Sequence, residues 1–143
     1  MKVLLQRVKR ACVRVDGDVV GAIERGILVF LGVERGDTAQ DVEALAAKTA
    51  EIRIFPDASG RMNLDVRQAG GAILVVSQFT LAASTRRGLR PSFDGAEEPQ
   101  RARELYLAFV EALRATGIVV ATGTFGAMME VELVNDGPVT FLL

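Results

Sequence analysis

The chain has 143 residues, half of them hydrophobic, and a formal net charge of −1. This length suffices for one domain with a substantial core, so we expect a single domain over residues 1–143. The near-neutral charge argues against indiscriminate binding of nucleic acids, and no apolar run approaches the roughly 18–20 residues of a membrane span. Since no signal peptide is visible, we expect a cytoplasmic protein. The mean hydropathy of +0.27 suggests that an oligomer buries part of its surface.

The chain contains no histidine. This excludes Ser-His-Asp and Cys-His arrangements, zinc bound through histidine, and an imidazole acid–base group. The single cysteine, Cys12, can form neither an intrachain disulfide nor a thiolate cluster. An enzyme of this composition would work with carboxylates, hydroxyls, lysines, backbone groups or groups of its substrate. We expect neither a metal nor a cofactor.

The spacing of apolar residues predicts a strand-rich chain with two helices. Strands are expected at residues 2–8, 11–15, 18–20, 27–33, 53–56, 73–76, 118–121, 129–134 and 139–143. Asp37 and Gln40 resemble a capping box at the start of a helix that runs to about residue 52. A second helix is expected from Pro99, a good first-turn residue, to a stop at Gly117.

Two helices cannot cover both faces of a sheet this large. We therefore expect a mixed, layered α/β/β fold, rich in strands, with both helices on one side. The other face of the sheet would be closed by the sheet itself or by a partner subunit. Both possibilities are open at this point.

One stretch in the middle of the chain is the first candidate site. The apolar run 73–76 changes abruptly into Ser77-Gln78-Phe79-Thr80, so a rigid strand delivers hydroxyl and amide groups to an edge. An ordinary polar loop after a strand produces the same pattern. A serine or threonine nucleophile needs a base, and no lysine or carboxylate stands at a recognisable spacing from these residues. The residues alone do not choose between the two interpretations.

Two turn-rich segments and two groups of arginines are further candidates. The glycines of Gly123–Met129 would let backbone N–H groups approach a ligand, although a plain connection between strands explains them equally well. Residues 135–140 are expected to form a turn between two strands. Arginines gather at positions 7, 10 and 14 and at positions 86, 87 and 90, the latter in a loop of about 18 residues, which is long for a compact domain. They suit phosphate contacts, or they are simply a solvated surface.

The chain resembles the D-aminoacyl-tRNA deacylases over essentially its whole length and in the same order. The matching segments are Gln6-Arg7-Val8, Gly60-Arg61-Met62-Asn63, Ser77-Gln78-Phe79-Thr80-Leu81, Gly88-Leu89-Arg90-Pro91-Ser92-Phe93, Gly123-Thr124-Phe125-Gly126-Ala127-Met128-Met129 and Asn135-Asp136-Gly137-Pro138-Val139-Thr140. The third and the last are highly specific in combination. One departure is Ala82, where an aromatic residue is more usual; it bears only on loop packing.

The resemblance implies hydrolysis of the ester that joins a D-amino acid to the terminal ribose of tRNA. It also implies acceptance of Gly-tRNA, including glycine mischarged on alanine tRNA. The enzyme would be a homodimer with its active sites at the interface. A cis Gly137-Pro138 dipeptide would reach into the pocket of the partner subunit and reject L-amino acids.

The resemblance also assigns roles to residues. The catalytic set is Ser77, Gln78, Phe79, Thr80 and Phe125. Gly126 and Met129 would bind the substrate together with Gly137 and Pro138. Contacts with tRNA, or support of the site, are expected from Arg7, Arg86, Arg87 and Arg90.

For the chemistry, we expect backbone N–H groups around Phe79, Thr80 and Phe125 to stabilise the oxyanion. The ribose 2′-hydroxyl would assist the attacking water, with Thr80 in a positioning role. Arg7 would either contact a phosphate or brace the Gly137-Pro138 turn. Two other functions stay open: an esterase of small substrates that uses a serine or threonine, and a catalytically silent, dimeric tRNA-binding module.

Overall fold

The structure, a computed structural model, describes residues 1–86 and 88–143. Its strands are β1 (Lys2–Val15), β2 (Asp18–Ile23), β3 (Gly26–Gly32), β4 (Phe55–Pro56), β5 (Met62–Leu64), β6 (Ala72–Ser77), β7 (Val120–Thr122) and β8 (Glu130–Leu142). Its helices are α1 (Ala39–Glu51), α2 (Pro99–Ala115) and the short 3-10 helix η1 (Phe79–Ala82). Six of the strands form one sheet in the order β2-β1-β3-β6-β7, with β8 paired to β1, and β4 and β5 form a separate hairpin.

Strand β1 organises the sheet. Its first half pairs antiparallel with β3 and its second half with β2, while β8 runs along the opposite edge of both halves. The strands predicted at 2–8 and 11–15 are therefore one strand of 14 residues. The apparent break falls at Lys9 and Arg10, which are exposed and lie where the register between β1 and β8 shifts.

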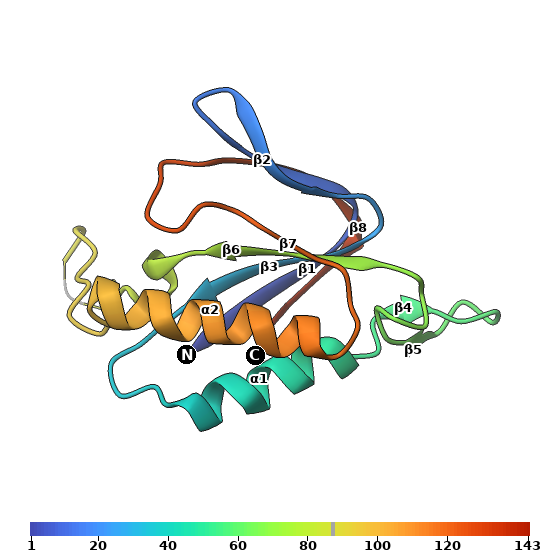
Figure 1. Ribbon diagram of the computed structural model, residues 1–143, viewed down its shortest axis with the longest axis horizontal. Coiled ribbons are helices and arrows are strands. Elements are labelled where there is room, and N and C mark those ends of the chain that lie inside the picture. The colour runs from blue at the N-terminus through green and yellow to red at the C-terminus, as the bar shows by residue number, and fades with distance from the viewer. Residues whose placement is uncertain (87) are drawn as a thin grey trace.

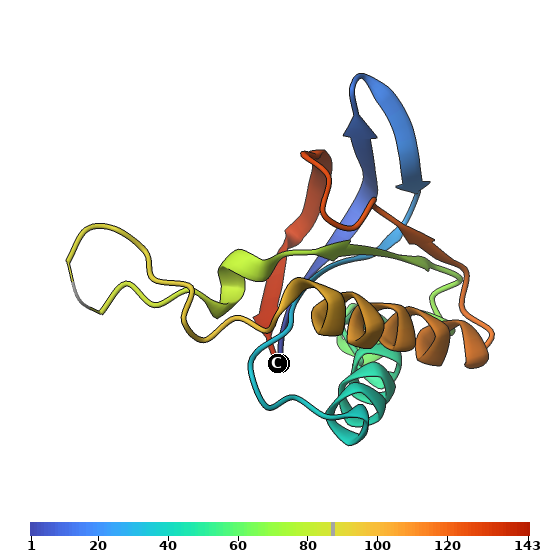
Figure 2. The same ribbon diagram turned by 60° about the vertical axis from the view of Figure 1, so that its left-hand side comes forward.

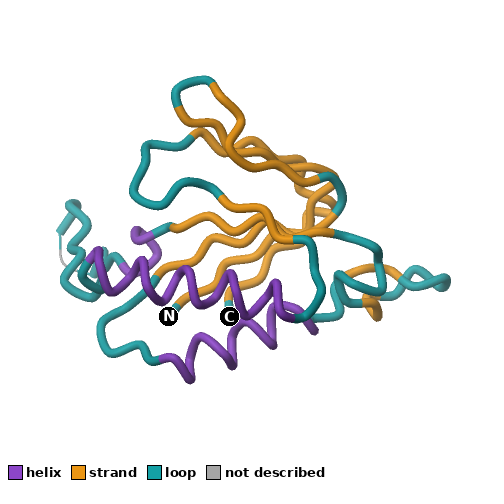
Figure 3. Tube along the Cα trace, in the orientation of Figure 1, coloured by secondary structure: helices purple, strands orange, loops and turns teal. Residues whose placement is uncertain are grey.

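The two helices lie side by side on one side of the sheet (Figures 1 and 3). Alternate residues of β1, β3 and β6 pack against them, among them Leu5, Val29 and Ile73, together with Phe109 and Leu113 of α2. This confirms the layered α/β/β fold predicted from the apolar spacing. Helix α2 begins at Pro99 as expected, whereas the capping box of α1 uses Thr38 and Asp41, one residue later than predicted.

The other face of the sheet is closed by the sheet itself. Residues Val8, Val13 and Ile23 of the β1–β2 half form a second core with Leu28 of β3 and Leu74 of β6. The close approach depends on Gly21, because a Cβ there would lie 2.2 Å from the carbonyl oxygen of Thr122 in β7. Of the two possibilities left open by the sequence, closure by the sheet is the one found within the chain.

Strand β8 differs from expectation in a way that matters for the site. The sequence predicts a turn at residues 135–140, but β8 runs unbroken from Glu130 to Leu142. Thr140 pairs with Gln6 and Asn135 with Val8, so residues 136–139 of β8 lie opposite Arg7 alone. The excess residues form a bulge that displaces Gly137 and Pro138 from the ladder, and both are exposed. Among the described residues, no helix is long and apolar enough to cross a membrane.

Candidate active site

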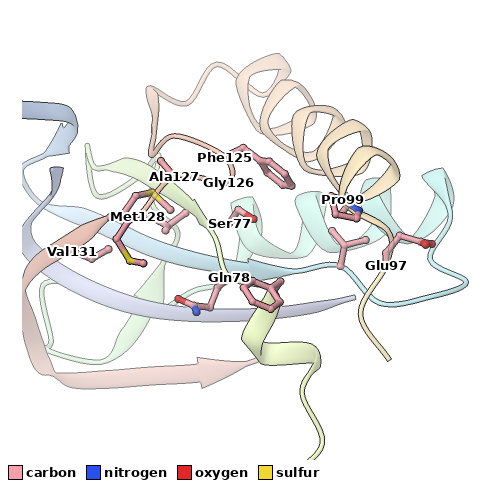
Figure 4. A pocket seen from close by; sticks show the side chains of 14 residues that line it. Ser77, Gln78, Glu97, Pro99, Phe125, Gly126, Ala127, Met128 and Val131 are labelled. Atoms are coloured by element: carbon pink, nitrogen blue, oxygen red, sulfur yellow. The ribbon is translucent and has the colours of Figure 1, made fainter. Parts of the chain in front are cut away.

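A cavity of about 530 Å³ opens where β6 ends, between the start of α2 and the segment that joins β7 to β8. Figure 4 shows Ser77, Gln78 and Phe125 around it, with Glu97 and Pro99 at the beginning of α2. It is lined by Val33, Val76, Ser77, Gln78, Phe79, Glu97, Pro99, Ala102, Phe125, Gly126, Ala127, Met128, Met129 and Val131. The structure thus brings together six of the residues predicted for the site: Ser77, Gln78, Phe79, Phe125, Gly126 and Met129.

The floor of the cavity is built by the end of β6 and by η1. The backbone N–H of Gln78 donates to Leu31 of β3 at 2.8 Å, and the chain then turns into η1. This turn packs tightly on β3, because a Cβ at Gly32 would lie 2.8 Å from Cβ of Leu81 and 3.0 Å from the carbonyl oxygen of Gln78. Gly32 therefore permits the close packing at the cavity floor. In the sequence it lies within the apolar strand 27–33, so the strand pattern does not draw attention to it.

Thr80 lies beside the cavity and does not line it. Its hydroxyl accepts a hydrogen bond from Nε2 of Gln78, and the side chain is exposed. The nearest partner of the hydroxyl is thus an amide, which cannot act as the base that a nucleophilic threonine requires. This arrangement orients Gln78.

The opposite wall comes from the segment Gly123–Met129. The N–H of Gly123 donates to the carbonyl oxygen of Val75 at 3.0 Å, and the same oxygen accepts from the Tyr106 hydroxyl at 3.0 Å. The Tyr106 ring lies 5.5 Å from the Phe125 ring, centroid to centroid. Helix α2 therefore fixes both the end of β6 and the aromatic wall of the cavity through one side chain.

Tyr106 is the group with the strongest change in acidity. Burial raises the pKa of its phenol to about 12, partly offset by the positive charge of Arg114 and by a hydrogen bond with the Thr122 side chain. Its hydroxyl therefore stays protonated and continues to donate to Val75 at all physiological pH values. The sequence analysis gave Tyr106 no role at the site.

Backbone donors are available in the lining of the cavity, at Phe79 and Phe125, and beside it, at Thr80. The first N–H groups of a 3-10 helix have no acceptor within the helix, and this applies to Phe79 and Thr80. Outside helices and strands, no backbone hydrogen bond of the described residues uses the N–H of Phe79, Thr80 or Phe125. These are the three N–H groups that the sequence analysis selected for oxyanion stabilisation, a role that requires unpaired donors.

The Gly137-Pro138 bulge lies outside the cavity formed by this chain. The peptide bond between the two residues is cis, and Gly137 has φ of +131°. A Cβ at Gly137 would lie 2.7 Å from Cγ2 of Val139 and 3.3 Å from Nη2 of Arg7, so only glycine fits. Nε of Arg7 donates to the carbonyl oxygen of Asp136 at 3.1 Å, and Nη1 donates to Ile54 at 2.6 Å.

The four arginines of the sequence analysis fall into different environments. Arg7 is buried and hydrogen-bonded to the bulge, which agrees with the second of its two expected roles, bracing the Gly137-Pro138 turn. Arg86 and Arg90 are exposed in the loop between η1 and α2. Arg87 lies outside the described residues.

Several lining residues were not anticipated. Glu97 and Pro99 enter the cavity because residues 95–97 return to the end of β3, with the Glu97 N–H donating to Val33 at 3.1 Å. The helix-start signal at Pro99 was visible in the sequence, but this long-range pairing was not.

Comparisons with known proteins agree with this geometry. A family model described as D-Tyr-tRNA(Tyr) deacylase matches residues 4–143. The D-aminoacyl-tRNA deacylase of Shewanella loihica is 59% identical over 143 residues, which cover 100% of this chain and 99% of the relative. That of Geobacter metallireducens is also 59% identical, and the match covers 100% of this chain and 95% of the relative.

Solved structures are similar as well. One of a c-Myc DNA Unwinding Element Binding Protein has a TM-score of 0.95 at 41% identity, covering 100% of this chain and 97% of the other. One described as a probable eukaryotic D-amino acid tRNA deacylase has a TM-score of 0.86, covering 99% and 97%; at 17% identity it shows the fold alone.

The fold, the cavity and these relatives define an enzyme, a hydrolase that acts on carboxylic ester bonds. The chain belongs to the D-Tyr-tRNA(Tyr) deacylase family, over essentially its entire length.

Proposed function

We propose that the protein hydrolyses the ester bond of D-aminoacyl-tRNA, releasing the free D-amino acid and tRNA. It would do so in the cytoplasm, as a homodimer, and would also act on Gly-tRNA, including glycine mischarged on alanine tRNA. The observation that carries the proposal is the cavity at the end of β6, which has an apolar wall and, within the described part of the chain, backbone N–H groups without a backbone partner. Its geometry suits an aminoacyl ester whose amino-acid side chain is not recognised by the enzyme.

The position of the bulge supports the dimer. Gly137 and Pro138 are exposed and lie outside the cavity of their own chain. If the segment acts at a pocket, the pocket must belong to a second copy. Phe141 and Leu142, farther along β8, are 41% and 63% exposed, so the neighbouring surface is apolar enough to be covered by that copy.

Discrimination between enantiomers then rests on exclusion. In the proposed complex, the carbonyl oxygens of Gly137 and Pro138 from the second copy face the α-carbon of the aminoacyl group. The side chain of an L-amino acid would project into these oxygens. The side chain of a D-amino acid points away from them, so D-amino acids are accepted whatever their side chain. Glycine projects nothing towards them, so Gly-tRNA is hydrolysed as well. Arg7 holds the filter in place through its hydrogen bonds to Asp136 and Ile54.

The chemistry needs few side chains. Water attacks the carbonyl carbon of the ester, and the N–H groups of Phe79, Thr80 and Phe125 stabilise the resulting oxyanion; one such donor is typically worth about 100–1000-fold in rate. The bond to the ribose oxygen then breaks. The 2′-hydroxyl of the same ribose relays the proton from the attacking water to the leaving oxygen. Arg86 and Arg90 contact tRNA phosphates, so affinity falls as salt rises.

Separate incubation with D-Tyr-tRNA and L-Tyr-tRNA tests this function. The proposal requires release of D-tyrosine and negligible release of L-tyrosine. Equal release of both would indicate an esterase without chiral selection, and retained tRNA binding without turnover of either would indicate a binding module. Either result contradicts the proposal.

A further inference from the structure

The loop between η1 and α2 extends away from the body of the molecule (Figure 2). Its base is closed by two backbone hydrogen bonds between Ser84 and Ser92, of 2.8 and 2.9 Å. Beyond this closure, the side chain of Leu89 is fully exposed, with a relative accessibility of 106%. We call the described residues of this loop, 84–86 and 88–92, the 84–92 loop.

The composition of the 84–92 loop suits nucleic acid. Its described residues include Arg86 and Arg90 and no carboxylate; the next acidic residue is Asp94, which is engaged by the Ser92 hydroxyl at 2.7 Å. Guanidinium groups bind phosphates, and leucine is one of the apolar residues that proteins wedge against bases. A fully exposed leucine between two arginines therefore suits one contact with a nucleobase and two contacts with phosphates.

The base of the 84–92 loop is connected to the cavity. The ring of Phe93, directly after Ser92, lies 5.0 Å from the ring of Phe79, which lines the cavity. At the other end of the loop, the N–H of Ala83 donates to Thr80 at 3.1 Å. Both ends of the loop therefore lie next to residues of η1 at the cavity.

We propose that the 84–92 loop binds the acceptor end of the tRNA, with Leu89 packed against a nucleobase and Arg86 and Arg90 on the flanking phosphates. The inference rests on the proposed function and names the part of the chain that holds the RNA beyond its terminal nucleoside. A second copy of this chain is the other possible occupant. The basic charge of the loop favours RNA, because the chain as a whole is nearly neutral.

The test compares two substrates, D-Tyr-tRNA and the D-tyrosyl ester of adenosine, which lacks every preceding nucleotide. The variants are Leu89→Ser and Arg86→Gln/Arg90→Gln. The matched control is Arg61→Gln/Arg67→Gln, which removes two exposed arginines near β5, at the opposite end of the molecule (Figure 1). Binding of uncharged tRNA is measured over a range of salt concentrations, so one readout does not depend on catalysis.

We expect Leu89→Ser to lower kcat/KM on D-Tyr-tRNA by about tenfold, as for loss of the burial of most of one leucine side chain, and to leave the adenosine ester unaffected. The double arginine variant should reduce the salt dependence of tRNA binding, by about 0.7–0.9 in logarithmic slope for each arginine. The control should change neither.

Equal losses on both substrates, or no loss on either, would overturn the inference. So would a change from dimer to monomer in Leu89→Ser, which would assign the loop to a second copy. If the wild type hydrolyses neither substrate, the proposed function fails. The proposal for the 84–92 loop is then tested by binding alone: an unchanged salt dependence of tRNA binding in the double arginine variant would overturn it.

Discussion

Arg7 of β1 reaches across to β8, where its Nε lies 3.1 Å from the carbonyl oxygen of Asp136 and 3.3 Å from the carboxylate oxygen Oδ2 of the same residue. One arginine thus stands opposite the four residues of the bulge and satisfies one backbone group that the bulge removes from the ladder, the carbonyl oxygen of Asp136. Because Arg7 also binds Ile54 at 2.6 Å, the bulge is tied to the segment before β4. Strand pairing and the position of Gly137-Pro138 are therefore coupled.

Arg7→Gln should destabilise the protein by about 2–3 kcal/mol, because hydrogen bonds to a charged group are lost and the carbonyl oxygens of Ile54 and Asp136 are left without a partner. Rejection of L-Tyr-tRNA should weaken with it, since the bulge loses its support. Chemical denaturation and the ratio of kcat/KM on D-Tyr-tRNA to that on L-Tyr-tRNA check both. Arg10→Gln is the control: its ion pair with Glu132 is exposed and 3.8 Å long, so a change of less than about 0.5 kcal/mol is expected. Equal effects of the two substitutions would contradict the bracing role.

Thr80→Ala should retain most of the activity, within about tenfold of the wild type, because the substitution removes only the acceptor of the Gln78 side chain. Thr80→Val, which keeps the shape of the side chain, should behave similarly. Single-turnover rates on D-Tyr-tRNA are the appropriate measurement. Complete inactivation of both variants would make Thr80 the nucleophile.

Tyr106 should make stability depend on pH in the alkaline range. Below pH 10 the phenol is protonated in both states and its contribution is complete. The unfolded chain loses the proton at about pH 10, the folded one at about pH 12, so stability falls by about 2–3 kcal/mol as pH rises between these values. The difference in unfolding free energy between wild type and Tyr106→Phe isolates this effect.

The chain has one tyrosine and no tryptophan, so the ultraviolet absorbance of the phenolate follows Tyr106 alone. A titration midpoint at the ordinary value would contradict the buried hydrogen bond. At neutral pH, Tyr106→Phe should cost about 1 kcal/mol, since Val75 keeps its second donor, Gly123.

Phe93→Ala should lower activity on both D-Tyr-tRNA and the D-tyrosyl ester of adenosine, because Phe93 acts through Phe79 at the cavity. The loss of the aromatic pair, about 0.5–1.5 kcal/mol, predicts a decrease of about two- to tenfold. This distinguishes Phe93 from Leu89, whose effect should appear only with tRNA. A decrease confined to tRNA would place Phe93 on the RNA instead.

The sequence was sufficient for the features set by local patterns. Apolar spacing predicted the layered fold, and Pro99 predicted the start of α2. The change from Val76 to Ser77 marked the cavity floor, since a strand that leaves the core must end in groups that face water.

Features that depend on long-range pairing were missed. The Asn135–Thr140 segment has the composition of a turn, and only its pairing with β1 makes it a bulge in one continuous strand. Arg7 was expected either to contact a phosphate or to brace the Gly137-Pro138 turn, and only its hydrogen bond across to β8 decides for bracing. Glu97 reaches the cavity because its backbone pairs with Val33, which no local pattern reveals.

The central claim is that Gly137-Pro138 of one subunit completes the cavity of the other, and a mixed dimer tests it most directly. One subunit carries Gln78→Ala/Phe125→Ala in the cavity; the other carries Gly137→Val, whose side chain would collide with Val139. The two are co-expressed with different affinity tags, and the mixed dimer is isolated. The homodimer with the cavity substitutions should be nearly inactive, because the Gln78 and Phe125 side chains that line the cavity are truncated. The Gly137→Val homodimer should hydrolyse L-Tyr-tRNA as well as D-Tyr-tRNA, because the displaced bulge no longer excludes the L-side chain.

If the cavity is completed across the interface, one of the two sites in the mixed dimer combines an intact cavity with an intact bulge. The mixed dimer should then hydrolyse D-Tyr-tRNA at about half of the wild-type rate, since a two-fold symmetric dimer has two equivalent sites, and should release negligible L-tyrosine from L-Tyr-tRNA. Release of L-tyrosine at a rate similar to that of D-tyrosine would mean that cavity and bulge act within one chain, and would contradict the claim.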